Sequence, residues 1–395
     1  MTWKLNNMAN NYKWIVTIAV MIIIIIAMVD TCKGQVGLNG AGFFENRTEL
    51  SDEWLLEETQ GNQWVLRLPG GAITKYANAT PFRGGWGLDS AIVDSITFLY
   101  KSFEEEQSND ILDKWYRKTA QQPITSYLYD LIDFNDKFNL KVIWAVNIYI
   151  PAEEAIKPIE FMVMNGIDII AVELGNESYS QVGHDFEEYV CKSEPIAAMV
   201  RNLGITVIHP AAPSGLRSRK DHEQWNESLK DYLENYPKDG VVFHPYFDDR
   251  EFSGLTAPVD TLLTLSQIGA FDWSSFFGGL VNEFPEASMH LITETNSQPS
   301  NLIGDTYLNA VLIDSILSAS VRSFDWVCLH NGVSPDKYGV IYGKEGEQKK
   351  NTSLAVWGEA VRKKKPVVVV DPICNRCKKI VYKLFNWRRC SSCNN

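Results

Sequence analysis

The feature that most constrains the fold is a regular alternation of short apolar stretches with helical segments. Eight stretches are rich in β-branched and other apolar residues and end in Gly, Pro, Asn or an acid: 36–44, 64–71, 141–149, 167–176, 205–212, 240–247, 290–295 and 325–330. Continuous apolar strands that alternate with helices are typical of a parallel sheet whose faces are covered by helices. Eight such units in about 330 residues favour an α/β fold of the (β/α)8 type, the TIM barrel.

Helix signals occupy most of the gaps between these stretches. Pro151 and the two acids that follow it predict a helix start, and Gly166 predicts its end. A second helix is expected over 184–203, with Gly204 as its stop, and apolar residues at spacings of three and four mark two more within 228–236 and 306–321. Residues 72–140 form a gap long enough for a large insertion.

An open doubly wound sheet is the competing architecture, and it usually has a glycine-rich phosphate loop after its first strand. The stretch "GLNGAG" (37–42) superficially resembles such a loop. We expect no helix to follow it, because "FFENRTEL" does not read as a helix start, and an isolated glycine pattern is weak evidence. The barrel is therefore preferred.

Both termini are distinct from the barrel, which we place at residues 35–365. Residues 1–34 contain the apolar run 14–29 behind Lys4 and Lys13. This run is short for a membrane-spanning helix and fits the core of a signal peptide. The sequence therefore predicts a secreted or cell-envelope protein, with an uncleaved membrane anchor or a lipid on Cys32 as alternatives.

The last segment, residues 366–395, is a basic tail with four cysteines: Cys374, Cys377, Cys390 and Cys393. Two Cys-x2-Cys pairs separated by twelve residues have the spacing of a four-thiolate zinc site. An oxidising compartment would favour disulfides instead, so structural zinc and disulfides both stay open. We expect the tail to take no part in catalysis.

Charge and aromatic content narrow the class of ligand. The net charge of −12 argues against nucleic acid binding through a basic surface. Aromatic residues make up 12% of the chain, with 12 Trp, which suits a protein that stacks rings on sugars. The expected partner is a carbohydrate, and the sequence leaves the oligomeric state open.

In a TIM barrel, the functional residues lie at the C-terminal ends of the strands. The polar and aromatic residues near those ends are Arg67, Asn147, Asn176, Glu177, His244, Tyr246, Glu294 and Trp326. Two carboxylates that face each other across a pocket suit glycoside hydrolysis, in which one donates a proton and the other attacks. Arg67 could keep Glu294 ionised, Tyr246 could orient that carboxylate, and Trp326 could form the floor under the sugar. Glu173, His209 and His330 are expected to be structural.

The motifs "LRLPGG" (66–71) and "ELGNE" (173–177), followed by "VVFHPY" and "LITETN", resemble those of the clan A retaining glycoside hydrolases. The similarity is greatest to the α-L-arabinofuranosidase, heparanase-like β-glucuronidase and β-xylosidase branches. It implies that Glu177 is the acid/base, Glu294 the nucleophile and Asn176 the ligand of the sugar 2-hydroxyl. Those relatives normally carry an accessory β-sandwich. We expect it to be missing or reduced, because about 65 residues follow His330 and they lack the required series of strands.

The predicted function is retaining hydrolysis of O-glycosidic bonds in poly- or oligosaccharides, with no cofactor or metal in catalysis. Two alternatives stay open. One is a catalytically inactive barrel that binds carbohydrate. The other is a zinc-binding interaction protein that acts through its tail.

Overall fold

The structure is a computed structural model that describes residues 34–40, 43–71, 74, 127–138, 140–180, 185–212, 220–247, 261–297, 306–334 and 339–362. The chain divides into two units, residues 33–364 and residues 1–32 together with 365–395, and all described residues belong to the first. The apolar run 14–29, most of the long insertion and the four tail cysteines lie outside the described residues. Within the described part, no helix has both the length and the apolar character that crossing a membrane requires.

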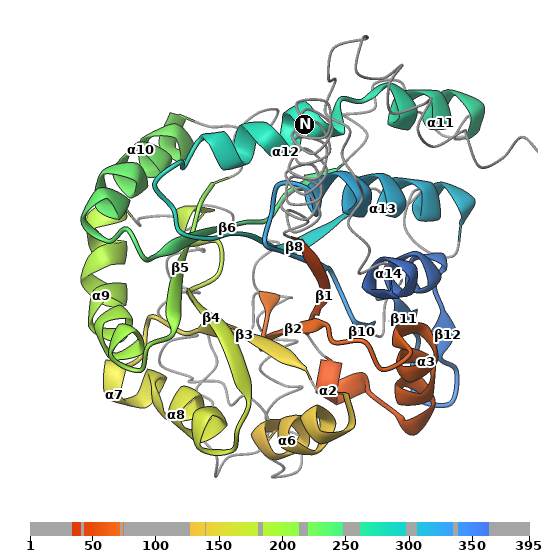
Figure 1. Ribbon diagram of the computed structural model, residues 1–395, viewed down its shortest axis with the longest axis horizontal. Coiled ribbons are helices and arrows are strands. Elements are labelled where there is room, and N and C mark those ends of the chain that lie inside the picture. The colour runs from red at the N-terminus through yellow and green to blue at the C-terminus, as the bar shows by residue number, and fades with distance from the viewer. Residues whose placement is uncertain are drawn as a thin grey trace, which may run out of the picture. The chain divides into compact units, whose positions relative to one another are not determined.

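Eight parallel strands form a closed barrel (Figure 1). Their order around the ring is β6-β5-β4-β3-β2-β1-β9-β8, and pairing of β6 with β8 closes it. The strands are β1 (Gln35–Asn39), β2 (Val65–Leu68), β3 (Lys141–Val146), β4 (Asp168–Leu174), β5 (Thr206–Pro210), β6 (Gly240–Phe243), β8 (His290–Ser297) and β9 (Trp326–Leu329). Each falls within or overlaps one of the eight expected stretches, so the predicted TIM barrel is confirmed. The two-residue strand β7 (Tyr246–Phe247) pairs with the end of β8.

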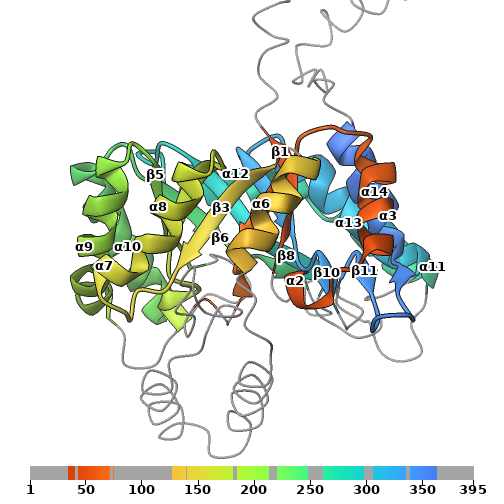
Figure 2. The same cartoon turned by 90° about the horizontal axis from the view of Figure 1, so that it is seen from below.

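Helices surround this ring, and Figure 2 shows α6, α8, α9 and α10 on its outer side. The described helices are α2 (Phe43–Asn46), α3 (Glu49–Thr59), α6 (Tyr127–Phe138), α7 (Ala152–Ala155), α8 (Lys157–Met164), the 3-10 turn η2 (Ser178–Ser180), α9 (Phe186–Asn202), α10 (Lys220–Asn235), α11 (Thr261–Ala270), α12 (Trp273–Asn282), α13 (Tyr307–Ser320) and α14 (Thr352–Arg362). The single helix expected after Pro151 is divided into α7 and α8. Gly166 and Gly204 follow α8 and α9 with φ of 74° and 75°, a left-handed conformation that ends a helix at little cost for glycine.

The expectation that no helix follows the first strand is wrong, because the short helix α2 begins at Phe43 and α3 begins at Glu49. The signal for α3 lies in the residues just before it. Thr48 caps the helix: its Oγ1 accepts a hydrogen bond from Ser51 N at 3.2 Å, and Ser51 Oγ accepts one from Thr48 N at 2.9 Å. This reciprocal pair satisfies two backbone N–H groups that a helix start leaves without partners.

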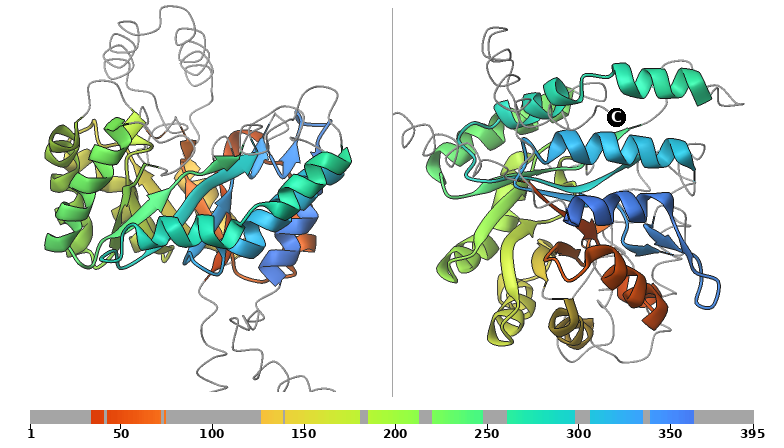
Figure 3. Two further views of the ribbon diagram at one scale, coloured as in Figure 1. Left: turned by 90° about the horizontal axis from the view of Figure 1, so that it is seen from above. Right: turned by 45° about the vertical axis from the view of Figure 1, so that its right-hand side comes forward.

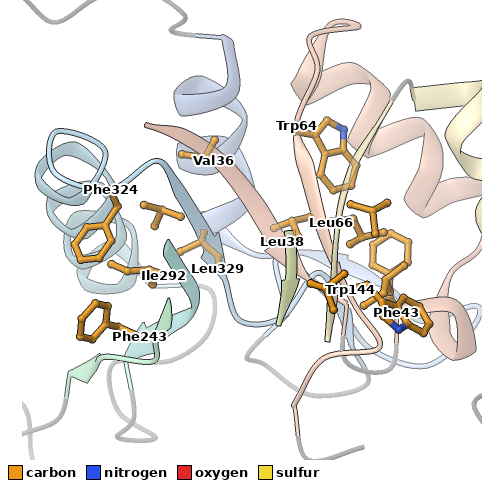
Figure 4. Packing of buried hydrophobic residues seen from close by; sticks show 14 of the residues in the cluster. Val36, Leu38, Phe43, Trp64, Leu66, Trp144, Phe243, Ile292, Phe324 and Leu329 are labelled. Carbon is orange, nitrogen blue, oxygen red and sulfur yellow. The ribbon is translucent and has the colours of Figure 1, made fainter. Parts of the chain in front are cut away.

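Apolar side chains fill the space on both sides of the strands. Outward-facing residues such as Leu38, Leu66 and Ile292 pack against the helices, as Figure 4 shows for part of this core. Inside the ring, a smaller apolar cluster is formed by Val65, Ile143, Ala171, Ile208, Val242, Leu291, Trp326 and Cys328. Because side chains alternate between the faces of a strand, the residue two positions after each inner residue also points into the barrel.

The chain after β9 forms a small sheet and one long helix. The sheet consists of β10 (Val333–Ser334), β11 (Ile341–Tyr342) and β12 (Lys349–Lys350), and the described residues after it contain α14 and no β-sandwich. Helix α14 lies between α3 and α13 (Figure 3). Trp357 ties it to the barrel, because its Nε1 donates to Gly37 O at 3.1 Å.

Candidate active site

A polar layer follows the inner apolar cluster toward the C-terminal ends of the strands. Val65, Ala171, Val242 and Leu291 belong to the apolar cluster, and two positions later the chain has Arg67, Glu173, His244 and Thr293. All four polar side chains are buried and hydrogen-bonded to one another or to neighbours in this layer. A buried layer of charge is tolerated only when its members satisfy one another, because an unpaired buried ion is strongly destabilising.

Arg67 is the centre of this layer, and it is fully buried. A guanidinium has five N–H donors, and Arg67 donates five hydrogen bonds to side-chain oxygens. Two go to Glu173, from Nε at 2.8 Å and from Nη2 at 2.6 Å. The others go to Asn176 Oδ1 at 2.8 Å, Asn39 Oδ1 at 3.2 Å and Glu294 Oε1 at 2.5 Å. One side chain of β2 therefore fixes residues on β1, β8 and the end of β4.

Glu294 is held by three donors. Its Oε1 accepts from Arg67 Nη1 and from Gly71 N at 3.0 Å, and its Oε2 accepts from Tyr246 Oη at 2.7 Å. Burial would raise the pKa of this carboxyl, but the charges of His244 and Arg67 overcome that effect and hold the pKa well below its usual range. Glu294 is therefore ionised at neutral pH in a nearly dry site.

His244 joins the three carboxylates of the site. Its Nε2 donates to Thr293 Oγ1 at 2.8 Å, and that hydroxyl donates to Glu173 Oε2 at 3.0 Å. Its Nδ1 lies 3.2 Å from Glu177 Oε1. Burial alone would lower the pKa of His244, but the charge of Glu294 and hydrogen bonds to Glu173 and Glu177 raise it to about 9. The imidazole is thus a cation at neutral pH, with both nitrogens donating.

Glu177 follows the end of β4, and its carboxylate lies near that of Glu294. Its side chain is 31% exposed, so it is accessible to a ligand, whereas that of Glu294 is 5% exposed. Glu177 has φ of 49°, a left-handed conformation that non-glycine residues rarely adopt and that is concentrated at functional sites. A carboxylate oxygen of Glu177, one of Glu294 and a ring nitrogen of His244 all lie within 4.8 Å of one another.

These three residues are also the one group of three metal-ligating side chains found among the described residues. Both ring nitrogens of His244 already have hydrogen-bond partners, Thr293 Oγ1 for Nε2 and Glu177 Oε1 for Nδ1. In this structure the three residues therefore belong to a hydrogen-bonded network.

The structure brings most of the expected site residues together. Arg67, Asn176, Glu177, His244, Tyr246 and Glu294 form one connected network. Asn147 lies just beyond β3, where its Oδ1 accepts from Tyr149 N at 2.9 Å, and its role in binding stays a prediction. Sequence reasoning missed Asn39 and Thr293. Alternation along β1 places Asn39 inside the barrel, whereas Thr293 and its neighbour Glu294 both reach the site because the register of β8 shifts between Ile292 and Thr295.

Trp326 lies at the other end of the barrel, so the prediction that it forms the floor of the sugar site is wrong. It is the first residue of β9 and pairs with Gln35 and Leu291, near the starts of β1 and β8. Its indole belongs to the inner apolar cluster, with Lys141 Nζ 5.3 Å from the ring centroid. The residue of this strand that reaches the site is His330, which the sequence predicted to be structural. Its Nδ1 lies 3.7 Å from Glu294 Oε2.

Comparison with known proteins gives distant structural similarities. No protein-family model and no curated protein match the sequence. One similar solved structure is a GH128 endo-β-1,3-glucanase from Amycolatopsis mediterranei in complex with laminaritriose, with 10% identity, coverage of 82% of this chain and 99% of that chain, and a TM-score of 0.43. A second is the endoglucanase Cel5A of Pseudomonas stutzeri, with 14% identity, coverage of 83% and 93%, and a TM-score of 0.42. A third is the catalytic domain of GH30 xylanase C from Talaromyces cellulolyticus, with 10% identity, coverage of 83% and 75%, and a TM-score of 0.41. At these values the similarity is distant.

Proposed function

We propose that this protein is a retaining glycoside hydrolase in which Glu294 is the nucleophile and Glu177 the acid/base. The observation that supports this most is the separation of the two carboxylates, whose oxygens approach within 4.8 Å. Retaining glycosidases have carboxyl groups about 5–5.5 Å apart, whereas inverting enzymes need roughly 6.5–9.5 Å to admit a water. The short separation therefore favours direct attack by Glu294 and disfavours a barrel that only binds carbohydrate.

The hydrogen bonds indicate which oxygen of Glu294 attacks. Oε1 is held by Arg67 and Gly71, whereas within the described residues Oε2 accepts from Tyr246 alone. The oxygen with fewer donors keeps more of its charge, so Oε2 is the better nucleophile. It forms a bond to the anomeric carbon while the glycosidic C–O bond breaks and Glu177 gives its proton to the leaving oxygen.

The second half of the cycle returns the enzyme to its starting state. Glu177, now a carboxylate, takes a proton from water, whose oxygen displaces Glu294 from the anomeric carbon. His244 stabilises Glu177 in this anionic form, because its Nδ1 donates to Glu177 Oε1 at 3.2 Å. The two displacements together retain the configuration of the anomeric carbon.

Asn176 is oriented to bind a sugar hydroxyl. Its Oδ1 accepts from Arg67 Nη2 at 2.8 Å, which a guanidinium can only donate, so the identity of the two amide atoms is fixed. The NH2 group is then the part of the side chain left to donate to the substrate. This agrees with the role in binding the 2-hydroxyl that the sequence resemblance implies.

The substrate, location and cofactors extend the proposal. The motifs "LRLPGG" and "ELGNE" favour arabinofuranosides, glucuronides and xylosides of poly- or oligosaccharides. We further propose secretion or attachment to the cell envelope through residues 1–34, and catalysis that needs no cofactor or metal. Chelator treatment should leave turnover unchanged.

The proposal is tested with a panel of aryl arabinofuranosides, glucuronides, xylosides and glucosides. The wild-type protein should hydrolyse one class, and NMR of the first-formed sugar should show the anomeric configuration of the substrate. Glu294→Gln should abolish this turnover with an unchanged unfolding curve. Inverted product, or full activity in Glu294→Gln, would contradict the assignment.

A further inference from the structure

Asn39 and His330 form a pair beside Glu294 that the proposed mechanism does not use. Asn39, the last residue of β1, is fully buried, and its Nδ2 lies 2.8 Å from His330 Nδ1. His330 follows β9 and is anchored through its backbone, because its N–H donates to Thr295 O at 3.1 Å and its carbonyl accepts from Asn296 Nδ2. Its side chain is 21% exposed.

The orientation of the Asn39 amide follows from Arg67. Nη1 of Arg67 lies 3.2 Å from one end of the amide, and a guanidinium nitrogen has no lone pair with which to accept. The end that faces Arg67 must therefore be the carbonyl oxygen. A reversed amide would place two donors against each other inside a buried layer, a conflict that leaves both unsatisfied.

The orientation of the amide fixes the state of the imidazole in turn. With its oxygen turned to Arg67, Asn39 presents its NH2 group to His330, and its Nδ2 also lies 3.4 Å from Asn331 Oδ1. An NH2 group can only donate, so His330 Nδ1 must accept. A ring nitrogen that accepts carries no proton, and the neutral ring then has its proton on Nε2.

We propose that Asn39 is a positioning residue that holds His330 neutral, as its Nε2–H tautomer, next to the nucleophile. Arg67, which can only donate, sets the orientation of the Asn39 amide, and that amide sets which nitrogen of His330 carries no proton. The part of the proposal that concerns catalysis rests on the proposed function of Glu294.

This arrangement preserves the charge on the attacking oxygen. His330 Nδ1 is 3.7 Å from Glu294 Oε2, too long for a hydrogen bond, and in the accepting state it has no proton to share with Oε2, because its one lone pair accepts from Asn39. Protonated at Nδ1, the same ring would pair with Oε2 and draw charge from it. Among the described residues, the titratable groups near the ring include Tyr246, at 5.8 Å between centroids, and Arg67 beyond Asn39.

The tautomer can be measured directly on the intact protein, without substrate. The chain has six histidines, and after labelling with ¹⁵N-histidine, long-range ¹H–¹⁵N correlation spectra distinguish a protonated from an unprotonated ring nitrogen. The signals of His330 are those that disappear in His330→Gln. We expect an unprotonated Nδ1 and a protonated Nε2 at neutral pH. A proton on Nδ1 would overturn the proposal.

Two matched variants test the role of Asn39. Asn39→Asp puts an acceptor against both Arg67 and His330, so Nδ1 should become protonated and kcat on the best aryl glycoside should fall about tenfold to a hundredfold, as is typical when the orienting partner of a functional histidine is changed. Asn331→Asp adds the same charge nearby but leaves the Asn39 amide as donor, so the tautomer should be that of the wild type.

The outcomes separate this inference from the proposed function. An unchanged tautomer in Asn39→Asp, or unchanged kcat despite protonation of Nδ1, would overturn the positioning role. If Asn39→Asp does not fold, the wild-type spectrum and Asn331→Asp still decide the tautomer. A wild type with the expected tautomer but no turnover of any glycoside would contradict the proposed function and leave the tautomer assignment standing.

Discussion

At the scale of single residues, the site depends on the geometry of Arg67. Its planar fork reaches two carboxylates and two amides at once, and no other side chain has five donors. The sequence predicted its pairing with Glu294 but not the two hydrogen bonds to Glu173. Alternation along β4 shows that Glu173 points inward. It does not show at what height Glu173 meets Arg67 across the ring, because that depends on the stagger of the strands.

Arg67→Lys keeps the positive charge but has three donors in place of five. At least two buried acceptors lose their partner, which should lower the free energy of unfolding by about 1–3 kcal/mol for each one left unsatisfied. Glu294 and Asn176 should also lose their fixed orientation, with a loss of activity on the order of a hundredfold or more. Denaturant unfolding and turnover of the aryl glycoside measure the two effects.

Arg201→Lys is the matched control. Arg201 on α9 pairs with Glu194 and Asp239 on the outer side of the barrel, remote from the polar layer. It should lose stability by the same mechanism while keeping full activity. If Arg67→Lys retained both stability and activity, Arg67 would not be the centre of the site.

At the scale of elements, apolar runs predicted the positions of the strands well. The position of a side chain along the barrel axis was predicted wrongly for Trp326. All eight barrel strands are signalled by β-branched or apolar runs, because both faces of each strand are buried. Trp326 and His330 point to the same side of β9 but are four residues apart, or about 13 Å along a strand. Only the residue nearer the C-terminal end can reach the site. Helix α3 was missed because its start is encoded by capping hydrogen bonds and not by apolar periodicity.

Thr48→Ala tests that account of α3. The change removes the acceptor for Ser51 N and the hydrogen bond from Thr48 Oγ1 to Gln348 Oε1 at 2.5 Å. Loss of an N-cap should lower the free energy of unfolding by about 1–2 kcal/mol. Thr48→Ser keeps the acceptor and should stay near the wild type by denaturant unfolding. Equal losses in the two variants would show that the cap does not stabilise the helix.

At the scale of the whole molecule, the site and the stability of the barrel share the same charges. The polar layer places Glu173 and Glu294 with Arg67 and His244 inside the ring. Burial raises and Arg67 lowers the pKa of Glu173, with a net shift downward, as for Glu294. The pKa of His244 is shifted in the opposite direction, to about 9. Because of these opposed shifts, the free energy of unfolding should fall both when the pH is lowered and when it is raised.

The expected stability is highest at about pH 5 to 6.5. The lowered carboxyl pKa values stabilise the fold above the unfolded value of about 4.3, and this contribution is lost as the pH falls below it. The raised pKa of His244 stabilises the fold fully below the unfolded value of about 6.5. That contribution, roughly 3 kcal/mol, is lost as the pH rises toward 9. Thermal unfolding between pH 3 and 9 measures both limbs.

His244→Gln separates the loss of stability at alkaline pH from the loss at acid pH. Without a titrating imidazole, the decline between about pH 6.5 and 9 should disappear, while the acid limb set by the carboxylates should remain. An alkaline decline of the same size in the variant would mean that another group causes it.

The most direct test of the central claim, that Glu177 and Glu294 act as acid/base and nucleophile, is rescue by azide. Glu177→Ala and Glu294→Ala are each given azide with an activated aryl glycoside, and the anomeric configuration of the glycosyl azide is determined by NMR. In Glu177→Ala, azide should displace Glu294 from the covalent intermediate and give product of the same configuration as the substrate. In Glu294→Ala, azide should take the place of the nucleophile and give the inverted product. The same configuration from both variants, or the two results exchanged, would contradict the assignment.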